Sequence, residues 1–165
     1  MDDATMKSIE EYHAAIKLLF DRDSQEMFPN NNEEHTAAII EEIFRHAKNT
    51  IKVFCTSLNH DVWGKPDIQD AFIRAFCHGI KFEFIIQKCM DMSSDLAKLI
   101  KVLKVPVKEN IAADVGCNFI VADKKMFRFE RDSKERHAFA CANNSEISAM
   151  LETLFDNLAA NAGGF

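Results

Sequence analysis

The side chains that could do chemistry are concentrated late in the chain, in one strongly basic segment. Such a segment could bind an anionic partner, for example a single nucleic acid strand or an acidic protein surface. A set of solvated turn residues is the simpler alternative, and the sequence leaves both open. The cationic residues of the segment are Lys124, Lys125, Arg128, Arg131, Lys134 and Arg136.

Arg128 and Asp123 each have two interpretations. Arg128 lies two positions before Glu130 on an expected strand, so both side chains project from one face. They could form an exposed ion-pair row with a neighbouring strand, or Arg128 could bind phosphate. Asp123, directly before two lysines, suits a hairpin corner, and turn chemistry alone would explain it.

Two histidines are expected near the strand ends where a nucleophile or base could act. His60 lies in the loop after the first expected strand, and His137 begins the last one. A solvated or capped loop histidine is the simpler interpretation of both. His137, Lys124, Lys125 and Arg128 are the candidates for ligand binding.

The basic segment begins with an expected β-hairpin, whose strands cover residues 115–122 and 126–130. The first strand is rich in β-branched and aromatic residues, and the second alternates phenylalanine with charged residues. Along the first strand, Cys117 faces opposite to Gly116 and Asn118. This alternation predicts a core thiol rather than a nucleophile.

The rest of the chain alternates helices and strands. Asn32 is the expected N-cap of the second helix and Asn144 that of the last one. Loops are predicted over residues 27–32 and 57–65. Trp63, in the second loop, could anchor the following helix or form an exposed interface residue. Helices are expected over residues 4–20, 33–48, 66–78, 94–103 and 145–158, and further strands over 50–56, 80–87, 105–108 and 137–142.

This alternation predicts an α/β fold, with a mixed sheet covered by helices on both faces. Residues 1–30 are expected to form an N-terminal helical extension, 31–160 the main domain and 161–165 a flexible tail. The first helix has an apolar stripe that must pack on its own domain or on a second copy of the chain. The stripe consists of Ile9, Tyr12, Ile16, Leu19 and Phe20.

Composition limits the setting and the partners. The net charge of −6 makes a general binder of duplex DNA a poor expectation. The five cysteines have no spacing typical of a zinc site, so reduced and mostly buried thiols are expected, with no metal and no cofactor. An acidic N-terminus and the lack of a long apolar run predict a cytoplasmic protein without a membrane span.

The order of these elements, with a Pro66-led helix that ends at His78-Gly79 and a hairpin centred on Asp123, resembles single-repeat members of the phospholipase D-like superfamily. The resemblance covers residues 33–158. That family carries His-x-Lys-x-x-x-x-Asp on such a strand, followed by a Gly-Ser-x-Asn-like strand. The resemblance implies a two-fold dimer, a histidine nucleophile, and lysine and asparagine as ligands of the phosphate oxygens.

In this sequence the motif is degenerate. Asp123 matches the family aspartate, but Gly116 stands at the histidine position and Asn118 at the lysine position. Asn143, in Ala-Cys-Ala-Asn, can be laid on the family asparagine. A glycine cannot form a phosphoenzyme and an amide carries no fixed positive charge, so the resemblance implies the fold more securely than the activity.

Two classes of function remain open. The favoured one is a catalytically inactive phospholipase D-like domain that forms a homodimer and acts as an interaction or regulatory module for another protein. The alternative is a phosphodiesterase or nuclease with an altered site, or a nucleic-acid binder that does not cleave. Nucleic-acid binding would be weak and salt-dependent on this charge balance.

Overall fold

The computed structural model describes residues 3–30, 32–111, 115–131 and 137–163. Within them the strands form one seven-stranded sheet in the order β1-β7-β6-β5-β2-β3-β4. Strands β2, β3 and β4 are parallel, and the other neighbours are antiparallel. The strands are β1 (Met27–Asn30), β2 (Thr50–Cys55), β3 (Lys81–Ile86), β4 (Val107–Lys108), β5 (Cys117–Ala122), β6 (Met126–Arg131) and β7 (His137–Cys141).

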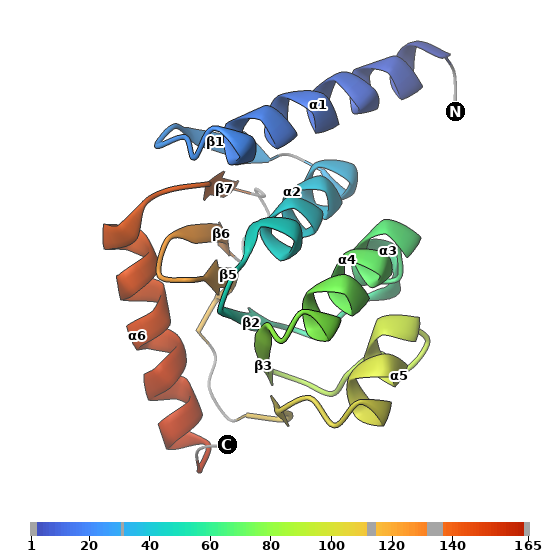
Figure 1. The fold of residues 1–165 in the computed structure, drawn as a ribbon. Coiled ribbons are helices and arrows are strands. Elements are labelled where there is room, and N and C mark those ends of the chain that lie inside the picture. Colours follow the sequence, from blue (N-terminus) through green and yellow to red (C-terminus); the bar gives the residue numbers. More distant parts are fainter. Residues whose placement is uncertain (1–2, 31, 112–114, 132–136, 164–165) are drawn as a thin grey trace.

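Helices cover both faces of the sheet, which confirms the predicted α/β class. Helix α6 lies alone along one side, and α2, α4 and α5 lie on the other (Figure 1). The helices are α1 (Asp3–Asp21), α2 (Glu33–His46), α3 (His60–Trp63), α4 (Pro66–Cys77), α5 (Asp95–Val102) and α6 (Ser145–Asn161). None of those helices, in the part of the chain described here, has the length and apolar character that a membrane crossing needs.

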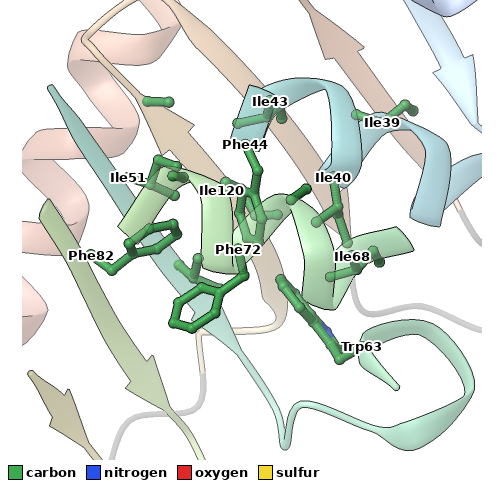
Figure 2. Packing of buried hydrophobic residues seen from close by; sticks show 14 of the residues in the cluster. Ile39, Ile40, Ile43, Phe44, Ile51, Trp63, Ile68, Phe72, Phe82 and Ile120 are labelled. Carbon is green, nitrogen blue, oxygen red and sulfur yellow. The ribbon is translucent and has the colours of Figure 1, made fainter. Parts of the chain in front are cut away.

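The central strands are apolar because they are buried on both faces. In β2, Ile51 and Val53 belong to the core under α2 and α4, while Phe54 points to the core under α6. The Phe82 ring of β3 lies 5.3 Å from the ring of Phe44 and 4.8 Å from that of Phe72, so strand and helices interlock (Figure 2). This packing fixes the strand ends that carry the polar residues.

Two segments predicted as loops contain regular structure. Residues 27–30 pair with β7 as an edge strand, where the missing N–H of Pro29 costs no ladder bond to a further strand. Residues 60–63 form the single-turn helix α3, capped by the Asn59 side chain, which accepts from the Val62 N–H at 3.1 Å. The proline and the run of asparagines are typical of a loop, and the strand that pairs with this segment lies far away in sequence. The sequence therefore did not predict β1.

The ends of the chain also differ from expectation. Helix α6 continues to Asn161, three residues beyond the predicted end at residue 158, and Leu158 and Ala159 are buried. Strand β1 makes part of residues 1–30 a component of the sheet, and the division of the chain at residue 30 stays a prediction. The predicted caps Asn32 and Asn144 are both confirmed by side-chain hydrogen bonds to backbone N–H groups.

Helix α1 packs within its own chain, against α2 and the β1 edge (Figure 1). Of its apolar stripe, Ile16 and Phe20 are only 2% and 4% exposed. Phe20 packs edge-on against Phe28 with ring centroids 6.2 Å apart, and Tyr12 stacks on His35 at 3.6 Å. Tyr12 and Leu19 are partly buried against the same core, so most of the stripe is covered within its own chain.

Replacing Ile16 by alanine tests this packing. We expect Ile16→Ala to lower the free energy of unfolding by about 2–4 kcal/mol, because it leaves a cavity in the core. Leu18→Ala on the same helix, where the side chain is 46% exposed, should change it by less than about 0.5 kcal/mol. Urea denaturation at two protein concentrations measures both, and a loss that depends on concentration would place Ile16 in a contact between chains.

Candidate functional site

The hairpin predicted around Asp123 is present as β5 and β6, and Asp123 is its corner residue. Its carboxylate accepts hydrogen bonds from the backbone N–H groups of Lys48, Asn49 and Thr50, at 2.6, 2.9 and 2.9 Å. Both Asp123 and Lys124 have positive φ, 55° and 53°, a conformation that aspartate tolerates. Asp123 thus does more than form a turn: it anchors the hairpin to the start of β2.

Asn118 lies at the opposite end of β5, where its side chain is occupied by hydrogen bonds. Its Oδ1 accepts from the backbone N–H of Thr56 at 3.0 Å and from the Thr56 hydroxyl at 3.2 Å. Gly116, two residues earlier, has φ 65°, and a Cβ built there would meet no atom within 4 Å. Cys117 between them is buried on the α6 face, as the alternation predicted.

Arg128 of β6 is 4% exposed, which contradicts the expected exposed row of ion pairs. Its guanidinium donates to Glu130 Oε2 at 2.9 Å, to Thr36 Oγ1 at 3.1 Å and to Asn30 Oδ1 at 3.2 Å. The predicted shared face with Glu130 is correct, but α2 and β1 cover the arginine. A buried cation with this set of acceptors balances its charge inside the protein.

Between Asn118 and Arg128 the sheet and the loops around it enclose a cavity of about 110 Å³. The loop after β2 and helix α3 form one wall, and α2 forms another. Its polar side chains are mostly neutral, with a single acidic and a single basic residue. The polar lining residues are Thr36, Thr56, Ser57, Asn59, Asn118, Arg128 and Glu130.

The remaining reactive groups near this cavity are held in neutral form. Burial raises the pKa of the Cys55 thiol, which lines the cavity, to about 12, so a thiolate is absent near neutral pH. Burial likewise raises the pKa of Tyr12 to about 12, and the positive charge of Arg128 only partly opposes it. No histidine is among the residues that line the cavity.

The other predicted site residues lie elsewhere in the fold. Asn143 follows β7 at the Asp123 end of the sheet, where its amide is 3.4 Å from the backbone oxygen of Asp23. Lys125 forms an ion pair with the Asp23 carboxylate, and Lys124 is exposed at the same corner. The structure therefore does not bring these residues together with Asn118 and Arg128.

The basic segment is divided in a similar way. Arg131 and His137 are exposed neighbours in the β6–β7 ladder, at the far end from Lys124. Lys134 and Arg136 lie outside the described residues. His60 is exposed on α3, and its ring lies against Gly64, whose added Cβ would be 2.4 Å from Nδ1. Trp63 is 6% exposed beside Phe44, so it is a packing anchor.

No local pattern in the sequence indicates the partners that occupy Asn118 and Arg128. Thr56 and Asn118 are 62 residues apart, and Asn30 and Arg128 are 98 apart. Such long-range pairs can be predicted only when the strand order of the sheet is known. The described residues contain no group of histidine, cysteine, aspartate and glutamate side chains arranged to hold a metal ion.

No protein-family model matches the sequence, and no curated protein is significantly similar to it. Among solved structures, the chain is similar to Nuc from Salmonella typhimurium, a phospholipase D family member, with 13% identity and a TM-score of 0.61, covering 82% of this chain and 93% of that one. NucT from Helicobacter pylori matches with 14% identity and a TM-score of 0.57, covering 82% and 95%. The chain therefore has the phospholipase D-like fold.

The archaeal chromatin protein TrmBL2, whose structure shows a novel mode of DNA binding, has the same fold in part. It matches with 12% identity and a TM-score of 0.61 over 94% of this chain, which spans 60% of TrmBL2. At these identities the likeness concerns the fold alone. The fold recognised from the hairpin and the order of elements is thus confirmed.

Replacing Asp123 by alanine tests its role as an anchor. We expect Asp123→Ala to lower the free energy of unfolding by about 2–4 kcal/mol, because three N–H groups lose a charged acceptor. Lys124→Ala is the matched control, since it has φ 53° in the same turn but removes no acceptor. Chemical denaturation measures both, and equal losses would reduce Asp123 to an ordinary turn residue.

Proposed function

We propose that this chain is a phospholipase D-fold module that does not hydrolyse phosphodiesters and acts by binding another macromolecule. The observation that carries the proposal is the state of Asn118, whose side-chain oxygen is already bonded to Thr56. Gly116 beside it offers no side chain at all. In the related motif these two positions carry the histidine that attacks the phosphate and the lysine that binds it. Here the first has no side chain and the second is already hydrogen-bonded.

Phosphodiester cleavage through a covalent intermediate needs a nucleophile and fixed positive charge around the phosphate. Cys55 cannot serve as nucleophile near neutral pH, because burial raises its pKa to about 12. Arg128 cannot supply unopposed charge, because Glu130 pairs with it at 2.9 Å. A cavity of about 110 Å³ also leaves little room for a diester and an attacking water.

A nucleic-acid binder that does not cleave is the second candidate, and the likeness to TrmBL2 favours it. The basic residues do not form one exposed surface, because Arg128 is buried and Lys125 is paired with Asp23. This arrangement disfavours binding of nucleic acid. Binding of single-stranded DNA that is tight and insensitive to salt would favour this candidate over a protein-binding module.

We also propose that the module forms a homodimer, and that the outer face of α6 is the contact. This face carries Met150, which is 67% exposed, next to Ala149, Thr153 and Leu154. None of these side chains is charged, which suits a contact between two copies that each have a net charge of −6. An isologous contact buries the same patch on both copies.

The absence of hydrolysis is tested with bis-p-nitrophenyl phosphate and single-stranded DNA as substrates. We expect no turnover above the uncatalysed rate, and the same result for Asn118→Ala. That variant opens the Thr56 contact without removing the Asp123 anchor. Turnover by the unmodified protein that is lost in Asn118→Ala would contradict the proposal.

Light scattering tests the dimer and its surface. We expect twice the chain mass of 18.8 kDa at micromolar concentration, and a monomer for Met150→Glu, because each copy would bring a buried like charge to the contact. Val102→Glu is the control, since Val102 is 76% exposed on α5, away from the α6 face. A monomeric unmodified protein would refute the dimer, and a dimeric Met150→Glu would refute the proposed surface.

A further inference from the structure

A second cavity, of about 510 Å³, lies at the other end of the sheet from Asn118, between the last turns of α2 and α4. These helices pack side by side, and both end near the start of β2 and β3 (Figure 1). The volume is within the range of small-molecule sites, about 300–1,000 Å³.

The floor of this cavity is apolar and its rim is basic. Phe44, Ala71, Ala75 and Ile80 form the floor, and each is buried. Every charged or ionisable side chain of the lining is basic, although the chain as a whole has 26 acidic and 20 basic residues. The rim residues are Arg45, Lys48, Arg74 and His78.

Two of these cations form no ion pair with another described residue. Arg45 is paired with Glu41, with Nη2 and Oε1 2.5 Å apart. Lys48 and Arg74 are exposed and form no ion pair within the stretches that the structure describes. The His78 ring donates from Nδ1 to the Arg74 carbonyl oxygen at 2.6 Å, which holds the imidazole at the end of α4.

The helix dipole explains why cations stand at the ends of α2 and α4, but it does not explain the cavity. Helix α5 also has a cation in its last turn, Lys101, and Lys101 lines neither of the two cavities described above. At the ends of α2 and α4 the cations instead surround an apolar hollow. This arrangement fits a molecule with an anionic head and an apolar body.

We propose that the groove between the ends of α2 and α4 binds a small amphiphilic anion, with its acidic head at Arg74 and Lys48 and its apolar body on Phe44, Ala75 and Ile80. The head group is a carboxylate or a phosphate monoester, both of which an arginine can bind in bidentate form. The site shares no lining residue with the cavity at Asn118, so it is independent of the proposed loss of hydrolysis.

Binding is measured by titration of the full chain with decanoate and decyl phosphate below their micellar concentrations, followed by calorimetry and by amide shifts in NMR spectra. We expect both to bind and to shift the amides of Phe44, Ala75 and Ile80. Inorganic phosphate lacks the apolar body and uncharged decanol lacks the anionic head, so each should bind at least about tenfold more weakly. A preference between the two amphiphiles identifies the head group as carboxylate or phosphate.

Arg74→Gln should weaken binding of the amphiphiles about tenfold. Lys101→Gln is the matched control: it removes the same charge from the last turn of another helix, and we expect the affinity to change less than about twofold. Thermal denaturation shows that both variants remain folded. Equal effects of the two substitutions, equal binding of decanol, or shifts confined to other residues would each overturn the proposal.

Discussion

The fold depends on the contact between the Asp123 carboxylate and the backbone where β2 begins. Three N–H groups donate to this one side chain, including the first of the strand, at Thr50. Strand β2 stands between β3 and β5, and both of its faces are buried. A slip of one residue would exchange its two faces, so an anchor at its first residue holds the register of the central sheet. The positive φ of Asp123 lets the corner turn back toward that strand.

The polar residues at the other end of the sheet also stabilise the fold. Asn118 bonds to Thr56, and Arg128 bonds to Glu130, Thr36 and Asn30, so these groups satisfy one another in the folded chain. A site for phosphate chemistry needs the reverse, with charge and hydrogen-bond donors held ready for a ligand. In this chain Asn118 and Arg128 are instead bonded to side chains and backbone of the protein itself. That contrast is the physical basis for our proposal of a role in binding rather than hydrolysis.

The sequence predicted the elements whose signal is local. Each of these elements follows from residues within a few positions of one another: the helix that starts at Pro66, the caps Asn32 and Asn144, the strand β3 and the hairpin corner. It could not predict β1, which is a strand only because β7 lies beside it. It also misjudged Arg128, because the side chains that contact it come from α2 and β1, far away in sequence. Contacts between residues far apart in sequence therefore determine which side chains of the site are buried.

The central claim is that Asn118 and Arg128 are occupied within the protein and hold no phosphate. A crystal structure of the protein soaked with tungstate, a mimic of a transferring phosphoryl group, tests it most directly. We expect Asn118 Oδ1 still to accept from the Thr56 N–H near 3.0 Å, Arg128 still to pair with Glu130, and no tungstate to bind between them. Tungstate bound between Asn118 and Arg128, with either of these contacts broken, would contradict the account.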